Sequence, residues 1–103
     1  MTLDPVVRAV SKKAADAIHP RQIIAFGSRV RGTASAESDV DLLIVYDGPK
    51  SKREIQREVH RLFTHPEFSL DVFVMKPQEL AANKHIANTL AREVSEHGVV
   101  CYG

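Results

Sequence analysis

The stretch from residue 27 to residue 45, GSRVRGTASAESDVDLLIV, decides both the fold and the candidate site of this chain. It opens with a Gly-Ser turn that follows an apolar run, and it closes with a β-branched apolar run typical of a strand. Asp39 and Asp41 lie two positions apart at the head of that strand. Carboxylates so close repel each other, so their placement gives the fold no stability. A bound divalent metal ion would explain them.

A third carboxylate, Asp71, lies in the middle of another apolar run at residues 68–75. Side chains alternate between the two faces of a strand, so Asp39 and Asp41 share one face, and Asp71 shares a face with Phe73. If the two strands are neighbours, the three carboxylates converge. We therefore predict that Asp39, Asp41 and Asp71 are catalytic and bind metal. Two ions there could activate an attacking oxygen and stabilise a leaving one.

The Gly27-Ser28 turn is a candidate anion-binding element. Glycine lets the backbone approach a phosphate closely, and Ser28, if it begins a short helix, would point its amide and hydroxyl at an anion. Arg29 and Arg31 could add positive charge, with a solvated position for one of them as the alternative. Gly27 and Gly32 have the glycine spacing of a Walker-type phosphate loop, but no lysine follows the second glycine. That type of loop is therefore excluded.

Apolar periodicity predicts the helices. Apolar residues repeat three and four positions apart over residues 5–18, which predicts a first helix. Ser51 and Glu54 form a capping box that begins a second one. Pro77 opens a last helix, which we expect to continue to Gly98.

Short apolar runs predict the strands. They are rich in β-branched residues and are bounded by proline, glycine or aspartate. The alternation of these runs with helices predicts an α/β domain. The predicted strands cover residues 22–26, 40–46 and 68–75, with 99–102 as a possible addition, and the side chains expected in the core include Phe63, Phe73 and Met75.

Composition is that of an ordinary globular domain. The chain has 103 residues, of which 44% are hydrophobic and 26% charged, and a formal net charge of +1. We expect one domain over residues 1–103, without a membrane span and without strong nucleic-acid binding. Cys101 is the single cysteine and cannot form an internal disulfide, so a reduced, cytoplasmic protein is the expectation.

A basic stretch lies in and before the second predicted helix. Its default interpretation is a solvated face, and the alternative is a contact with RNA or with an acidic partner. Its members are Lys50, Lys52, Arg53, Arg57 and Arg61.

Taken together, Gly27-Ser28, Gly32 and residues 38–41 (Ser-Asp-Val-Asp), with Asp71 thirty positions further on, resemble the nucleotidyltransferase superfamily related to DNA polymerase β. The short chain is similar to its stand-alone branch, the minimal nucleotidyltransferases, which are often antitoxins beside a HEPN-domain toxin. The resemblance implies the nucleotidyltransferase fold, with a mixed three- to four-stranded sheet and helices packed mainly on one face. It also implies two Mg²⁺ ions and transfer of a nucleoside monophosphate from ATP to a hydroxyl.

The resemblance assigns the donor site by position. Gly27 and Ser28 would hold the β- and γ-phosphates of the nucleotide. Arg29, Gly32 and Ser38 complete the residues expected to bind the donor, although a hydroxyl such as that of Ser38 can also simply cap a loop backbone.

The resemblance also assigns the reacting groups. Asp39 and Asp41 would bind both metal ions, and Asp71 would bind the catalytic one and help to deprotonate the acceptor hydroxyl. Because the chain is short, the acceptor is expected to be a docked protein, by resemblance a tyrosine of a HEPN-domain toxin in a hetero-oligomer. The alternative is a non-catalytic antitoxin that neutralises its partner by complex formation.

Overall fold

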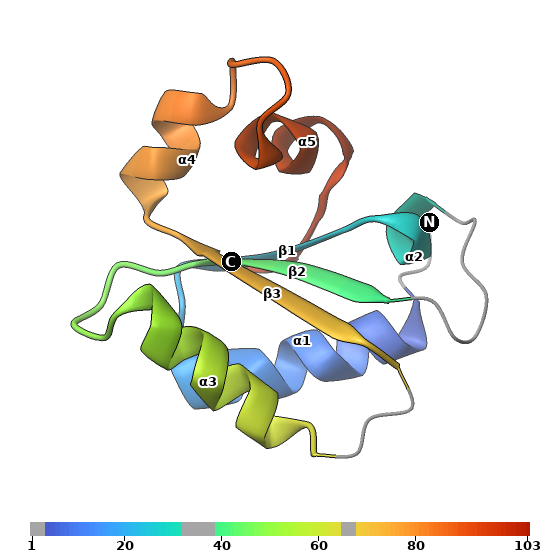
Figure 1. Ribbon diagram of the computed structural model, residues 1–103. Coiled ribbons are helices and arrows are strands. Elements are labelled where there is room, and N and C mark those ends of the chain that lie inside the picture. The colour runs from blue at the N-terminus through green and yellow to red at the C-terminus, as the bar shows by residue number, and fades with distance from the viewer. Residues whose placement is uncertain (1–3, 32–38, 65–67) are drawn as a thin grey trace.

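The computed structural model describes residues 4–31, 39–64 and 68–103, which form a four-stranded sheet with helices on both faces (Figure 1). None of the helices in these residues is long and apolar enough to cross a membrane. In chain order the elements are α1 (Pro5–Ile18), β1 (Gln22–Phe26), α2 (Ser28–Arg31), β2 (Val40–Val45), α3 (Lys52–Leu62), β3 (Leu70–Met75), α4 (Pro77–Asn83), α5 (Leu90–His97) and β4 (Val99–Tyr102).

The sheet has the strand order β3-β2-β1-β4, so that β3 and β4 form its edges. β1 pairs antiparallel with both β2 and β4, whereas β2 and β3 run parallel. The parallel pair is possible because α3 carries the chain back along the sheet between the two strands. The expected mixed sheet is confirmed, and residues 99–102 supply its fourth strand.

The two long helices begin where the sequence predicts. At the start of α1 the carboxylate of Asp4 accepts hydrogen bonds from the amides of Val6 and Val7, at 2.8 and 3.4 Å. At the start of α3 Ser51 and Glu54 form the predicted capping box, each side chain accepting from the other residue's amide. Both arrangements satisfy amides that the first turn of a helix leaves without intrahelical partners.

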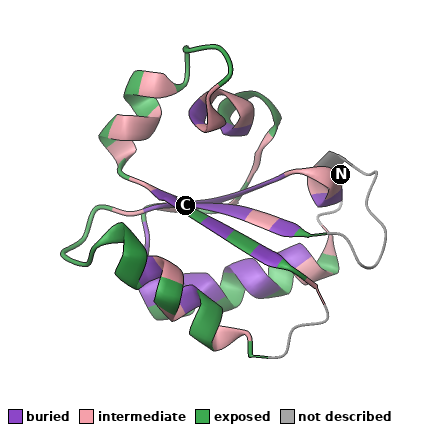
Figure 2. Ribbon diagram, in the orientation of Figure 1, coloured by how far each residue is buried: buried purple, intermediate pink, exposed green. Residues whose placement is uncertain are grey.

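α1 and α3 cover one face of the sheet and enclose the larger core, as the buried residues in Figure 2 show. Along β3 the buried Leu70, Val72 and Val74 face this core, and Asp71 and Phe73 between them are exposed. This alternation confirms the predicted assignment of the strand's two faces.

Two shorter helices, α4 and α5, lie over the opposite face and enclose a smaller core (Figure 1). α4 follows β3 directly, at the Met75 end of the strand, whereas Asp71 lies at the other end. The Asp71 end of this face therefore stays accessible. The buried side chains of this core are Ile24, Phe26, Leu43, Val45 and Val94.

The prediction of one continuous helix from Pro77 to Gly98 is wrong, because the chain turns between α4 and α5. Asn88 has a left-handed backbone with φ of 64°, which a continuous helix does not allow. The next residue, Thr89, caps α5 by accepting from the amide of Arg92 at 3.2 Å. Ile86, which lies in the turn between the two helices, is 51% exposed.

Candidate active site

The parallel register of β2 and β3 places Asp41 directly beside Asp71. Adjacent strands are about 4.8 Å apart, so the two carboxylates rise side by side from the same face of the sheet. Asp41 is half-buried and Asp71 is exposed. The expectation that these strands are neighbours is confirmed, and with it the approach of these two carboxylates.

Asp39 lies immediately before β2 and is exposed. Within residues 4–31, 39–64 and 68–103, no three His, Cys, Asp or Glu side chains are arranged to hold one metal ion. The three predicted ligands thus do not form a ready-made metal centre. Their chemistry nevertheless fits Mg²⁺, which is commonly held by one or two carboxylates together with water and the phosphates of a substrate.

Gly27 lies against the carboxylate of Asp41. Its backbone has φ of +86°, and a Cβ added to it would stand 2.2 Å from Oδ2 of Asp41. Both observations require glycine at this position, the first for the backbone and the second for space. The turn after β1 and the head of β2 are therefore packed together, with the Gly27 backbone beside the carboxylate pair.

Replacing Gly27 with alanine should destabilise the fold by about 1–2 kcal/mol, because a side chain is disfavoured in the left-handed region. The new Cβ would also displace the Asp41 carboxylate, so we expect loss of the nucleotide binding that the sequence resemblance implies. Urea unfolding and calorimetric titration with Mg²⁺ and nucleotide measure the two effects. Gly48→Ala is the control for a steric clash away from Asp41, since its added Cβ would displace the Tyr46 side chain instead and should leave the nucleotide affinity unchanged. Wild-type nucleotide affinity in Gly27→Ala would contradict this assignment.

α2 begins at Ser28, which is the condition stated for the anion-binding interpretation of this turn, and it is anchored by Arg29. The guanidinium of Arg29 is 3.2 Å from the carboxylate of Asp4, and its side chain is only 4% exposed. It also lies 6.0 Å from the centre of the Phe68 ring. The expected role of Arg29 at the donor site stays a prediction, and the structure adds that its ion pair with Asp4 links the turn to the start of α1.

Loss of Asp4 should destabilise the chain by about 2–4 kcal/mol, because one carboxylate both caps α1 and pairs with the buried Arg29. Asp4→Asn, which preserves the cap, should recover about 1 kcal/mol of the loss. The exposed Arg21–Asp47 pair is the control, and Asp47→Ala should change the free energy of unfolding by less than about 1 kcal/mol. Equal losses for Asp4→Ala and Asp47→Ala in urea unfolding would contradict this role.

Phe73 was expected in the core, and this is wrong: it is 39% exposed. It stands two positions after Asp71 on the same face, and its ring centre is 5.8 Å from that of Phe26. The two rings form an apolar surface next to the carboxylates of Asp41 and Asp71. The face-sharing of Phe73 with Asp71 is the signal in the sequence that could have placed it at the site.

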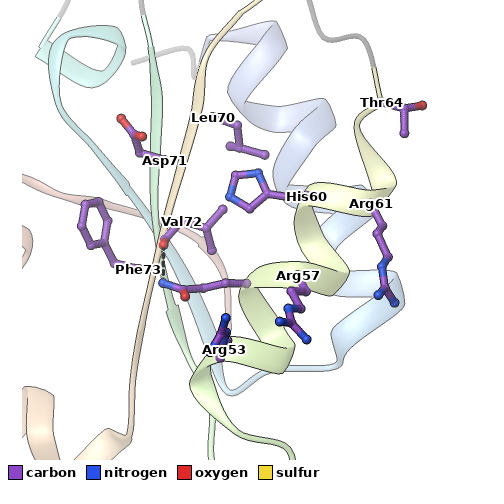
Figure 3. A pocket seen from close by; sticks show the side chains of 10 residues that line it. Arg53, Arg57, His60, Arg61, Thr64, Leu70, Asp71, Val72 and Phe73 are labelled. Carbon is purple, nitrogen blue, oxygen red and sulfur yellow. Dashed lines mark hydrogen bonds between the residues drawn. The ribbon is translucent and has the colours of Figure 1, made fainter.

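Asp71 also lines a groove of about 820 Å³ between α3 and the outer edge of β3 (Figure 3). The side chains of Arg53, Arg57 and His60 reach into it from α3. The groove thus joins the candidate site to the basic face of α3. Gly32 and Ser38 lie outside the described residues, and their expected roles at the donor site stay predictions.

Comparison with known proteins adds two findings. A family model described as a nucleotidyltransferase domain matches residues 6–101. A crystal structure of a toxin-antitoxin with AMP-PNP matches with a TM-score of 0.60 and 20% sequence identity, over 93% of this chain and 73% of that chain. At this identity the second finding shows likeness of fold. No curated protein sequence matches the chain.

Proposed function

The chain belongs to the nucleotidyltransferase domain family, and on that premise we propose that it transfers AMP from ATP to a hydroxyl group of a partner protein. Its mixed four-stranded sheet agrees with the fold that the family implies. The observation that carries the proposal is the pairing of Asp41 with Asp71 beside the Gly27 turn. The two carboxylates can bind a cation, and the Gly27 backbone beside them leaves room for the phosphates of a nucleotide that binds together with that cation.

On the donor side, Gly27 and Ser28 hold the β- and γ-phosphates. The missing side chain at Gly27 lets backbone amides approach the phosphate oxygens closely. Asp39, Asp41 and Asp71 are the residues that would hold Mg²⁺. When bound, Mg²⁺ supplies charge neutralisation and lowers the energy of the attacking and leaving oxygens.

On the acceptor side, Asp71 is exposed at the open end of the face and takes the proton of the incoming hydroxyl. The hydroxyl oxygen forms a bond to the α-phosphorus of ATP, the bond from that phosphorus to the bridging oxygen breaks, and pyrophosphate leaves. Such a transfer depends mainly on positioning and charge stabilisation.

The proposed acceptor is a toxin, which the chain inactivates as an antitoxin. Two observations support this: the fold is similar to that of a chain in a toxin-antitoxin structure with AMP-PNP, and the sequence resembles minimal nucleotidyltransferases. By that resemblance the acceptor is a tyrosine hydroxyl of a HEPN-domain toxin.

Neutralisation of the toxin in cells separates catalysis from simple complex formation. The toxin is expressed with the wild-type chain or with the Asp39→Ala, Asp41→Ala double variant, whose folding is checked by circular dichroism. We expect wild type to restore growth and the folded double variant to fail. Full rescue by the double variant would favour an antitoxin that acts by binding alone.

A further inference from the structure

Three arginines form a stripe along α3. Arg53, Arg57 and Arg61 recur every four residues, so they lie on one side of the helix, and all three line the groove beside β3 (Figure 3). All three are exposed, and none makes an ion pair within the described residues. The stripe is therefore available to a partner.

The lysines and glutamates in and just before α3 are already engaged. Lys50 is hydrogen-bonded to Glu58, and this contact raises the pKa of Lys50. Lys52 binds Glu79 at 2.8 Å and lowers the pKa of Glu79. Glu54 accepts from the Ser51 amide in the capping box. The basic stretch thus divides into paired lysines and a row of arginines whose spacing is unfavourable for an isolated helix, because like charges four residues apart repel.

The opposite wall of the groove is the outer edge of β3, an edge strand of the sheet. The carbonyl of Val72 faces the groove, where Nε2 of Gln56 donates to it at 2.9 Å. Successive peptide groups of a strand point to opposite sides, so those of Leu70 and Val74 face the same edge. Such an edge offers backbone donors and acceptors to an extended chain.

We infer that this groove binds an extended acidic segment of the protein acceptor. Residues four apart on a helix are about 6 Å apart along its axis, and side chains on one face of an extended strand are about 6.6–6.8 Å apart. Carboxylates at alternate positions of the segment therefore match the arginine stripe. Each guanidinium can bind a carboxylate through two parallel hydrogen bonds.

The lining of the groove favours a peptide over a nucleic acid. Single-stranded nucleic acids are held by a basic groove together with several aromatic side chains on which bases stack. Among the described residues that line this groove, Phe73 is the one with an aromatic ring apart from His60. The net charge of +1 adds no broad phosphate-binding surface.

The direction of the groove connects this inference with the proposed function, on which it rests. α3 ends at Leu62 and the chain returns to begin β3 at Leu70, so the Arg61 end of the stripe lies toward Asp71. The Asp71 carboxylate lies on the face of β3 turned away from α3, so a segment bound along the stripe would reach it by continuing around the Leu70 end of this edge strand. The groove would thus select the acceptor and deliver it to the reacting atoms.

Binding of a model peptide tests the groove without any catalysis. The probe is a fluorescein-labelled peptide in which glutamate alternates with valine, and its anisotropy is measured without ATP or Mg²⁺. The Arg53→Gln, Arg57→Gln, Arg61→Gln variant should lose about tenfold in affinity, since exposed ion pairs contribute modestly but add along a row. Arg8→Gln, Lys12→Gln, Lys84→Gln is the control, which removes the same charge from exposed positions outside the groove. It should bind as wild type does.

Two further probes make the outcome decisive. A peptide with lysine in place of glutamate should not bind, and a single-stranded oligouridylate should bind more weakly than the acidic peptide. The inference would be overturned if the wild-type chain bound the oligouridylate more tightly than the acidic peptide and the arginine variant lost that binding. The groove would then be a nucleic-acid site. Equal peptide binding by the arginine and control variants would also overturn the inference. Asp39→Ala should retain peptide binding, so failure of catalysis and failure of this inference give different results.

Discussion

Asp71→Asn should reduce AMP transfer by about three orders of magnitude, the range that loss of a positioned acid-base group produces. The same substitution should leave the metal-free chain as stable as wild type or more stable by about 0.2–1 kcal/mol. The reason is that like charges directly opposite each other on neighbouring strands destabilise a sheet, and Asp71 is the register partner of Asp41. Loss of activity with no loss of stability is the signature of a functional carboxylate.

Single-turnover transfer and urea unfolding in the presence of a chelator measure these two effects. Asp16→Asn is the matched control, because Asp16 is an exposed carboxylate on α1 and lies outside the site. It should change neither quantity appreciably. A rate of AMP transfer by Asp71→Asn within tenfold of the wild-type rate would show that Asp71 has no catalytic role. Clear destabilisation of Asp71→Asn would instead identify its carboxylate as a structural partner.

Mg²⁺ and nucleotide together should stabilise the chain far more than either one alone. The described residues form no group of three metal-ligating side chains, so we expect Mg²⁺ to take further ligands from water and from the phosphates of the nucleotide. The probe is α,β-methylene ATP, in which the bond broken by the transfer is replaced by an inert one. At a hundredfold excess over its dissociation constant, bound ligand contributes about 2.7 kcal/mol, which corresponds to a rise in Tm of about 12 °C for a domain of this size.

The Asp41→Asn variant should lose this cooperative rise in Tm, while its Tm without ligands remains measurable as the reference. A large rise with Mg²⁺ alone would show a preformed metal centre, contrary to the structure. An undiminished rise in Asp41→Asn would show that the nucleotide binds elsewhere.

Much of the fold follows from local patterns. The bounds of α1 are set by Asp4 and Pro5 at its start and by His19-Pro20 after its end, all of which are visible in the sequence. The two faces of β3 follow from strict alternation along the strand. Helix caps and strand alternation depend on residues that are close together in the chain, so both can be predicted from the sequence alone.

Two features that escaped prediction depend on contacts between distant segments. Nothing near Arg29 indicates that its partner is Asp4, which is 25 positions away. Phe73 is exposed because β3 is an edge strand and α4 and α5 cover only part of the face on which Phe73 lies. The order of strands in the sheet cannot be predicted from the residues of one strand. The break before α5 is a local feature without proline or glycine, and its signs in the sequence are Asn88, a residue type that tolerates the left-handed conformation, and Thr89 as a helix cap.

The candidate site, too, could be predicted from the sequence only in part. The alternation of side chains along each strand predicts which face carries Asp41 and which carries Asp71. Only the parallel register of β2 and β3 makes the two residues neighbours. The closeness of Gly27 to Asp41 likewise needs the antiparallel pairing of β1 with β2, which sets Phe26 opposite Asp41. Sequence supplies the chemical groups, and sheet pairing brings them together.

Transfer of label from α-³²P-ATP to the toxin partner is the most direct test of the central claim. The purified chain, Mg²⁺ and the toxin are incubated together, and the label on the toxin is followed by gel and by mass spectrometry. The account predicts a Mg²⁺-dependent AMP adduct on a hydroxyl of the toxin with the wild-type chain, and none with Asp41→Asn. An unlabelled toxin that the wild-type chain nevertheless binds and neutralises would contradict it.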